Sequence, residues 1–226
     1  MKSIVLLSGG LDSVVNLKVA ADRGEVVLAL TFDYGQQAFP NEAQAASTCA
    51  ALVAVPHRVI ELNWYKHLLP EPMTGREGFA RWSKSDEIGS DDALREAWIP
   101  NRNGVFINIG AAFAEFLGAD SIVMGLNREE GQVFPDNSRD FLEAANRALA
   151  YSTLRQIELV SYTVDLTKAE IVRLGMEIGA PIDHIYSCYQ RSSTQRMCGT
   201  CQSCVRLKES LEANGILERL KARFVE

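Results

Sequence analysis

Long apolar runs are absent from this sequence of 226 residues. No stretch approaches the ~18 consecutive apolar residues that a membrane-spanning helix requires. The apolar stretch before Ser8 is too short for the apolar region of a signal peptide, and no cleavage site follows it. Internal repeats, low-complexity tracts and long charged tails are also missing. We therefore expect a cytoplasmic protein without a membrane partner.

Basic residues are in the minority, since 23 lysines and arginines face 29 aspartates and glutamates and the net charge is −6. Nucleic-acid-binding proteins usually carry a basic face that neutralises phosphates, so we expect no nucleic-acid partner. Only three histidines are present, and they lie far apart in the sequence, at positions 57, 67 and 184. They give no support for a Ser–His–Asp arrangement.

Apolar residues make up 47% of the chain, enough for a core without disulfides. Near-continuous apolar runs predict five strands, at residues 3–7, 25–32, 58–62, 121–124 and 158–164. Helical spacing predicts helices at residues 11–21, 41–52, 104–117, 139–149 and 168–178. Apolar strands that alternate with helices are typical of a parallel sheet covered on both faces. We therefore expect an α/β fold with a doubly wound, Rossmann-like, five-stranded parallel sheet.

The composition divides the chain into two parts. Residues 1–184 form the predicted main domain. Within it, residues 63–100 break the alternation with all three tryptophans and many charges, and we interpret them as an inserted substrate loop or lid. Residues 185–226 hold a cysteine-rich turn and a helix, and we expect this segment to pack on the main domain.

The first predicted strand leads directly into the loop at residues 8–13, Ser-Gly-Gly-Leu-Asp-Ser, and a helix follows. The two glycines let backbone approach an anion closely, and the helix start presents free N–H groups and a positive dipole. Ser8 and Ser13 add hydroxyl donors. Asp12 would repel phosphates unless a divalent cation lay between them. The loop therefore predicts a site for a polyphosphate together with Mg²⁺.

This loop is neither a Walker A loop nor a dinucleotide-binding fingerprint, because no Gly-Lys-Ser/Thr follows and the glycine spacing differs. It resembles the SGGxDS loop of the N-type ATP pyrophosphatases, the PP-loop superfamily. In that superfamily the loop holds the pyrophosphate that leaves as AMP is transferred. The alternative is an ordinary glycine-rich turn with a capping serine or aspartate.

Four of the five cysteines, Cys188, Cys198, Cys201 and Cys204, fall within 17 residues. Four thiolates can close a tetrahedral zinc site, which would be structural because no coordination position stays open. An iron–sulfur cluster and a set of unliganded core thiols are the alternatives. We expect Cys49, which lies apart in an alanine-rich helix, to be a buried core residue.

Several motifs occur together in one order along essentially the whole chain, and the sequence resembles the QueC family of queuosine biosynthesis. The motifs are the loop at 8–13, Asp33-Tyr34-Gly35-Gln36, Ile99-Pro100-Asn101-Arg102-Asn103, Leu166-Thr167-Lys168-Ala169-Glu170-Ile171, Ser187-Cys188-Tyr189 and the closing cysteines. The resemblance implies an ATP-dependent ligase that converts 7-carboxy-7-deazaguanine and ammonia into the 7-cyano product. It also implies a homodimer. No glutaminase domain fits in this length, so free ammonia or a separate donor supplies the nitrogen.

We assign the roles of individual residues as hypotheses. ATP and Mg²⁺ would be held by the loop and by two strand ends: Ser8, Gly9, Gly10, Leu11, Asp12, Ser13, Asp33, Tyr34 and Gly125. The deazapurine would be bound by polar and aromatic residues of three segments: Asn101, Arg102, Asn103, Asn127, Phe134 and Asp136. Catalysis would rest on Asp12, Arg102 and Lys168, since a cation at a helix start can neutralise the α-phosphate. For Lys168 the alternative is a solvated surface lysine.

One segment departs from the family pattern, whose commoner form reads Tyr-Pro-Asp-Cys-Arg. This chain has Phe-Pro-Asp-Asn-Ser at residues 134–138, so only the proline and the aspartate stay in register. Two alternatives remain open: a relative that stops at the amide or transfers the acyl group to a macromolecule, and a tRNA-modifying ligase of the PP-loop superfamily. A non-enzymatic zinc module would leave the loop at 8–13 unexplained.

Overall fold

The computed structural model describes residues 1–74 and 98–225, and the sheet in these ranges has five strands. They are β1 (Lys2–Leu6), β2 (Glu25–Asp33), β3 (His57–Glu61), β4 (Ser121–Met124) and β5 (Glu158–Val160). Their order in space is β3-β2-β1-β4-β5, and every neighbouring pair is parallel. The predicted five-stranded parallel sheet is confirmed, although β5 ends four residues earlier than expected.

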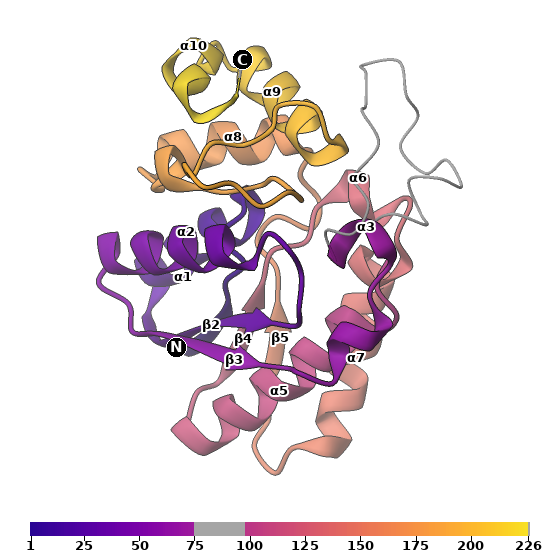
Figure 1. The fold of residues 1–226 in the computed structure, drawn as a ribbon. Coiled ribbons are helices and arrows are strands. Elements are labelled where there is room, and N and C mark those ends of the chain that lie inside the picture. Colours follow the sequence, from indigo (N-terminus) through magenta and orange to yellow (C-terminus); the bar gives the residue numbers. More distant parts are fainter. Residues whose placement is uncertain (75–97, 226) are drawn as a thin grey trace.

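Helices cover both faces of the sheet, which explains the near-continuous apolar strands. α1 (Leu11–Arg23) and α2 (Phe39–Leu52) lie on one face, and α5 (Arg102–Leu117) and α7 (Arg139–Ser152) lie on the other (Figure 1). β1, at the centre of the strand order, is buried in four of its five residues. The carboxyl ends of β1, β2 and β4 meet at one edge, where ligands of such folds bind.

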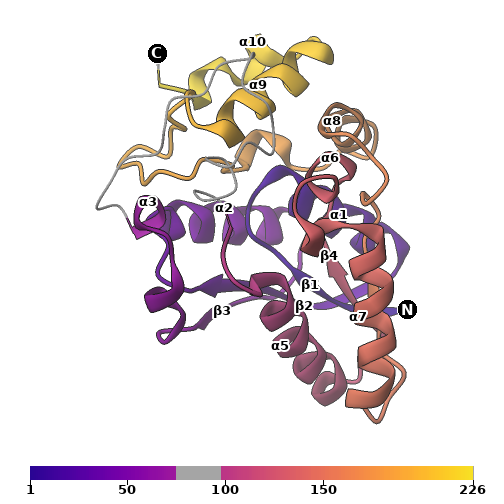
Figure 2. The same ribbon diagram turned by 90° about the vertical axis from the view of Figure 1, so that its right-hand side faces the viewer.

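The C-terminal part of the chain forms a further layer over α1 and α2 (Figures 1 and 2). α8 (Lys168–Glu177) starts with a capping box between Thr167 and Glu170, and it packs against α9 (Gln202–Ala213). α10 (Leu217–Leu220) follows, and Phe224 beyond it is buried and pairs with Met197 in a short bridge. The segment from residue 185 therefore contacts the rest of the protein extensively.

The predicted insertion at residues 63–100 lies partly outside the described residues, as do Trp82 and Gly89 within it. Its two described ends lie together, because the buried hydroxyl of Tyr65 donates a hydrogen bond to the carbonyl of Pro100. The N-terminal end holds a 3₁₀ turn (Tyr65–Leu68) and α3 (Glu71–Thr74). No helix of the described ranges is long and apolar enough to cross a membrane.

Candidate active site

The loop after β1 is braced by its own hydroxyl groups. Ser13 Oγ lies 3.0 Å from Ser8 Oγ and donates to the carbonyl of Gly10 at 3.0 Å. Gly9 has a positive φ of 82°, and a Cβ atom there would lie 2.6 Å from the carbonyl oxygen of Glu42. The N-terminus of α1 has no side-chain cap. Ser187 Oγ accepts from the backbone N–H of Leu11 at 3.4 Å, and the first turn of α1 lines a cavity that an anion can enter.

Gly125 brings the end of β4 against the start of α1. A Cβ atom at this position would lie 2.6 Å from the backbone nitrogen of Ser13, so only glycine permits this approach. Two residues further on, Asn127 is fully buried and donates from Nδ2 to Asp12 Oδ2 at 2.9 Å. Its Oδ1 caps α6 (Arg128–Gly131) by accepting from the backbone of Glu130 at 2.9 Å. Asn127 thus positions two acidic residues of the site.

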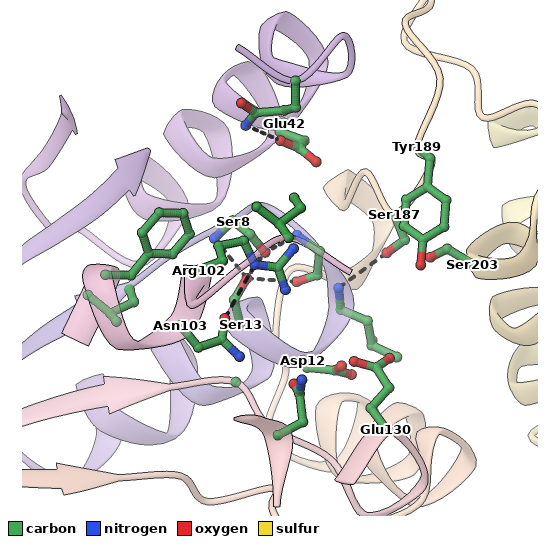
Figure 3. Close-up of a pocket in the computed structure, with 18 of the residues that line it drawn as sticks. Ser8, Asp12, Ser13, Glu42, Arg102, Asn103, Glu130, Ser187, Tyr189 and Ser203 are labelled. Carbon is green, nitrogen blue, oxygen red and sulfur yellow. Dashed lines mark hydrogen bonds between the residues drawn. The ribbon is translucent and has the colours of Figure 1, made fainter. Parts of the chain in front are cut away.

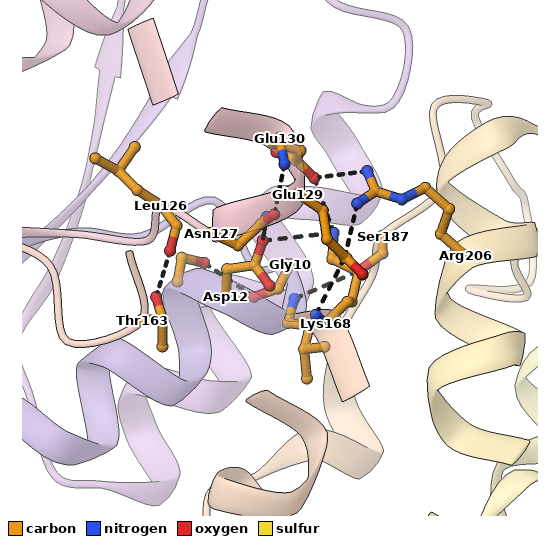
Figure 4. A network of polar contacts seen from close by, with 12 residues as sticks. Gly10, Asp12, Leu126, Asn127, Glu129, Glu130, Thr163, Lys168, Ser187 and Arg206 are labelled. Atoms are coloured by element: carbon orange, nitrogen blue, oxygen red, sulfur yellow. Dashed lines mark hydrogen bonds and ion pairs between the residues drawn. The ribbon is translucent and has the colours of Figure 1, made fainter. Parts of the chain in front are cut away.

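A buried network of opposite charges lies beside the loop (Figure 4). Lys168 Nζ lies 3.0 Å from Glu130 Oε1 and 3.4 Å from Asp12 Oδ2. Arg206 contributes from α9, with its guanidinium 3.2 Å from Glu130 Oε1 and 3.0 Å from Glu129 Oε2. Lys168 is 8% exposed, so it is not the solvated lysine that the sequence left open. Residues distant in the sequence therefore converge on one carboxylate, Glu130.

The electrostatics of this network keep Lys168 charged and Glu130 ionised. Burial alone would lower the pKa of Lys168, but the carboxylates of Asp12 and Glu130 outweigh burial and raise it. Burial would likewise raise the pKa of Glu130, but Lys168 and Arg206 outweigh it and lower the pKa to about 2. At Asp12 burial prevails and raises the pKa. Of these two carboxylates, Asp12 is therefore the one whose negative charge the neighbouring cations compensate less.

Asp12 also offers a ligand atom for a cation. Its Oδ1 is buried and has no hydrogen-bond partner among the described residues. A buried carboxylate oxygen without a partner is costly unless something else binds it. A divalent cation beside a polyphosphate would supply that partner, and carboxylate oxygens are the protein ligands that Mg²⁺ prefers. The donor set at Asp12 therefore fits Mg²⁺.

The opposite wall of the cavity carries a second polar group, centred on Arg102 at the start of α5 (Figure 3). Arg102 hydrogen-bonds the hydroxyl of Tyr34, and Tyr34 and Asp136 raise its pKa against the effect of burial. Asn103 Nδ2 donates to the carbonyl of Asp136 at 2.9 Å, which ties the 134–137 turn to α5. Glu42 faces the cavity from α2, and burial raises its pKa to about 7.

The C-terminal segment forms the remaining wall. The backbone N–H of Tyr186 donates to the carbonyl of Gly9 at 2.9 Å, so this segment contacts the loop directly. Tyr189 and Ser203 lie across the cavity from Arg102 (Figure 3). Gln202 and Arg206, one helical turn apart on α9, also line the cavity. The helix after the cysteines is therefore part of the site.

The structure brings most of the predicted site residues into one cavity. Those that line it are Ser8, Gly10, Leu11, Asp12, Ser13, Tyr34, Arg102, Asn103, Gly125, Phe134, Asp136 and Lys168. Four others lie outside the lining. Gly9 allows the close backbone packing of the loop, and Asn127 holds Asp12 by a hydrogen bond. Asp33 accepts from the backbone of Gly35 at 3.1 Å. Asn101 is an exposed residue with a left-handed backbone.

Sequence reasoning missed several residues of the cavity: Glu42, Trp98, Glu130, Ser187, Tyr189, Gln202, Ser203 and Arg206. A signal for Glu130 was present, because it follows the end of the fourth predicted strand by six residues. Gln202 and Arg206 share the four-residue spacing of one helix face. Glu42 offered no signal, since an acidic residue in the first turn of a helix is ordinary.

The four clustered cysteines are arranged as ligands of one metal ion. Their sulfur atoms all lie within 4.8 Å of one another, and Sγ of Cys198 is 3.8 Å from Sγ of Cys204. A tetrahedral ion about 2.3 Å from each sulfur would set sulfurs about 3.8 Å apart. Backbone N–H groups also point at the sulfurs of Cys188 and Cys198, at 3.3–3.4 Å, as suits thiolates. Cys49 is buried elsewhere, as predicted.

The departure at residues 137–138 has a structural explanation. Asn137 is buried and donates from Nδ2 to Asp136 Oδ1 at 2.9 Å, so it holds the aspartate in place. Ser138 caps α7 by accepting from the backbone of Phe141 at 3.1 Å. Both residues thus support the local structure that presents Phe134 and Asp136 to the cavity.

Comparison with known proteins identifies the family of the chain. The family model described as "Queuosine biosynthesis protein QueC" matches residues 2–215. The chain is 47% identical over 220 residues to a 7-cyano-7-deazaguanine synthase of Pelotomaculum thermopropionicum, covering 96% of this chain and 99% of the relative. It is 45% identical over 218 residues to one of Desulforudis audaxviator, covering 95% and 98%.

A solved structure shows the same fold. The complex of a 4-thiouridine synthetase with RNA and bound ATP superimposes with a TM-score of 0.53 at 19% identity. It covers 99% of this chain, and the chain spans 53% of that protein. The loop, the sheet and the family match lead to one conclusion: the chain belongs to the QueC family.

Proposed function

We propose that the protein is a 7-cyano-7-deazaguanine synthase, which converts 7-carboxy-7-deazaguanine and ammonia into the nitrile at the expense of ATP. The observation that carries this proposal is the buried Lys168, held between Asp12 and Glu130 beside the glycine loop. A fixed cation beside the glycine loop supports the binding of a polyphosphate there. The full-length similarity to relatives of that name supports the same reaction.

The chemistry requires two activations. A carboxylate is a poor electrophile, and adenylation converts one of its oxygens into a leaving group while pyrophosphate departs. Ammonia then displaces AMP to give the amide. A second ATP adenylates the amide oxygen, and loss of AMP with two N–H protons leaves the nitrile. Each step gathers negative charge on phosphoryl oxygens, which fixed cations stabilise in a site shielded from water.

The residues divide between these tasks. The loop hydroxyls and the N–H groups of α1 bind the leaving pyrophosphate, and Asp12 holds Mg²⁺, which neutralises phosphate charge when bound. Lys168 stabilises charge at the α-phosphate. Arg102 binds the carboxylate of the deazapurine, and Asp136 accepts from its amino group.

For the cysteine cluster we propose a zinc ion. The compact arrangement of the four sulfurs suits a single ion better than a multinuclear cluster, whose several iron atoms would hold the thiolates further apart. With four thiolates and no open position, the zinc joins the 186–189 segment to α9. Its function is to hold the third wall of the cavity in place.

We further propose a cytoplasmic homodimer that acts without a nucleic-acid partner. Support for a second copy comes from three exposed apolar side chains near the adjoining ends of α5 and α7, namely Phe116, Tyr151 and Leu154, which are 86%, 94% and 101% exposed. Support for the absence of nucleic acid is the net charge of −6. Sedimentation equilibrium and binding to labelled tRNA at low salt test the two statements.

The central experiment is mass spectrometry of the products. Purified protein is incubated with 7-carboxy-7-deazaguanine, ammonium and Mg-ATP, and both the base and the nucleotide are followed. Nitrile together with AMP is the expected result. Amide without nitrile would mean that the protein is an amide synthase. AMP formed only with another acceptor would refute 7-carboxy-7-deazaguanine as the substrate. Asp12→Ala should form no AMP while it keeps its fold, and near-normal turnover would contradict the loop assignment.

A further inference from the structure

Two aromatic rings face each other in the cavity at an unusual spacing. The rings of Trp98 and Phe134 are nearly parallel, with an interplanar angle of 6°, and their centroids lie 6.3 Å apart. Both side chains line the cavity and are half-buried. Trp98 precedes α5, whereas Phe134 belongs to the turn after α6. Two separate segments therefore present flat apolar faces to the same space.

The spacing is close to that of a slot for one planar ring. Carbon atoms in contact lie ~3.5 Å apart, so a flat ring that touches an aromatic face on each side needs about 7 Å between those faces. The centroid distance of 6.3 Å is the upper limit of the gap between the two nearly parallel faces, so the rings must move apart by at least about 0.7 Å to admit a ligand. Side-chain adjustments of this size are common on ligand binding. By contrast, Phe32 and Phe106 have centroids 4.1 Å apart, so they stack on each other directly.

The backbone that carries each of the two rings is held in place by neighbouring contacts. Ile99, next to Trp98, is 2% exposed, and the carbonyl of Pro100 accepts the hydroxyl of Tyr65. On the other side, the backbone N–H of Phe134 donates to the carbonyl of Glu130 at 2.7 Å. The hydrogen bond between Asn103 and Asp136 joins the two segments. These contacts fix the backbone that carries each ring. Only the side-chain torsions of Trp98 and Phe134 therefore need to change to admit a ligand.

The polar groups around the pair match a deazapurine better than the adenine of ATP. If the glycine loop binds the phosphates, the strand ends at Leu6, Phe32 and Gly125, which line the cavity next to the loop, offer the adenosine a place away from the aromatic pair. Asp136, two residues after Phe134, and Arg102 line the same cavity as the aromatic pair, and their opposite charges interact. A base that carries an amino group and a carboxylate has a partner for each of them.

We propose that Trp98 and Phe134 form an aromatic clamp that binds the deazapurine ring of the substrate between them. The inference rests on the proposed function and deepens it, because it identifies the part of the cavity that recognises the base. The clamp selects for flat bicyclic rings, and the charged groups next to it select for the substituents. It also turns the carboxylate of the base toward Arg102.

The test compares variants of the clamp with a matched control. In Trp98→Leu and Phe134→Leu, loss of base stacking should raise the Kd and KM for 7-carboxy-7-deazaguanine by about 5- to 150-fold. The KM for ATP should change less than twofold. Trp98→Phe should restore most of the affinity because it keeps a ring. The control Trp64→Leu, at a tryptophan that is 55% exposed and outside the cavity, should match the wild type.

A binding measurement separates the clamp from turnover. A variant with Trp64→Phe and Trp82→Phe keeps Trp98 as the sole tryptophan. Its fluorescence should be quenched when 7-carboxy-7-deazaguanine is added without ATP, and the same titration of Phe134→Leu in that background should shift to higher concentration. If Trp98→Leu leaves the KM for 7-carboxy-7-deazaguanine unchanged, or raises only the KM for ATP, the clamp is refuted. Nitrile formation by the wild type would still support the proposed function in that case. Absence of nitrile in the wild type would refute the function itself.

Discussion

Removal of the Arg206 guanidinium tests how the charge network beside the loop contributes to stability. In Arg206→Met the side chain keeps a similar length and loses its charge. Arg206 is 11% exposed at its side chain and contacts Glu129 and Glu130. Among residues 1–74 and 98–225, Glu130 then retains only Lys168 as a cationic partner. We expect the free energy of unfolding to fall, because a buried carboxylate loses part of its compensation.

The size of the effect follows from the pKa of Glu130. A decrease from 4.5 to about 2 corresponds to about 3 kcal/mol of stability at neutral pH. Lys168 contributes more to this decrease than Arg206 does. We therefore expect Arg206→Met to lose about 1–2 kcal/mol at pH 7.

The pH dependence gives the prediction its sign. The folded-state pKa of Glu130 is depressed, so its contribution is complete above about pH 4.5 and is lost as the pH falls toward about 2. The difference between wild type and Arg206→Met should therefore stay constant down to about pH 4 and shrink as the pH falls further toward about 2, because a loss of about 1–2 kcal/mol leaves the pKa of Glu130 in the variant only about one unit above that in the wild type. Urea unfolding followed by circular dichroism at several pH values measures this difference, with metal content determined at each pH because acid also protonates the thiolates.

Two results would refute this reasoning. A difference that stays constant from pH 7 down to about pH 2 would mean that Arg206 acts through packing of its aliphatic stem. A loss below ~0.5 kcal/mol at pH 7 would mean that the network does not stabilise the fold. The matched control is Arg173→Met, at an exposed arginine of α8, which should behave like the wild type at every pH.

Three further predictions concern the metal and the uncompensated groups of the cavity. Removal of the metal with a chelator should lower the melting temperature, because the ion joins two segments, and calorimetry showing an unchanged melt would argue against a structural metal. Gln202→Met should keep or increase the free energy of unfolding, because Gln202 Nε2 is buried without a hydrogen-bond partner in the described ranges; a loss above ~1 kcal/mol in urea would reveal a structural role. Glu42→Gln should stabilise the protein at pH 8, because the raised folded-state pKa of Glu42, about 7, means that the wild type loses stability as the pH rises from about 4.5 through 7. Its advantage should vanish below pH 4.5, and thermal unfolding at the two pH values checks this.

Local features of the sequence were sufficient to predict the sheet. All five strands and the five principal helices of the main domain lie where apolar runs and helical spacing predicted them, because buried parallel strands must be apolar on both faces. The ends of the helices and strands were predicted less accurately than their existence. α5 begins at Arg102, two residues before the prediction, and β5 ends at Val160 where the apolar run continues to Val164. Periodicity does not mark either boundary: the start of α5 follows the left-handed backbone of Asn101, which the apolar spacing does not reveal.

The candidate site was predictable only where a motif marks it. The loop at 8–13 and Lys168 were identified from sequence, and the family assignment is confirmed by the comparisons. Glu130 and Arg206 were not, because an ion pair between residues 76 positions apart leaves no periodic signal. The cysteines were recognised as a group, yet their spacing alone does not reveal that the following helix turns Gln202 and Arg206 into the cavity.

The contact between Tyr186 and Gly9 has a consequence for how the protein is made. The glycine loop leaves the ribosome early, whereas Tyr186, which contacts it, is synthesised almost 180 residues later. A nascent chain can assemble β1, β2 and β4 and still lack one wall of its catalytic cavity. On the proposal that the cysteines bind a structural zinc, activity begins only when the cysteine segment has emerged and bound its ion, and the supply of metal in the cell then limits how many finished chains become active.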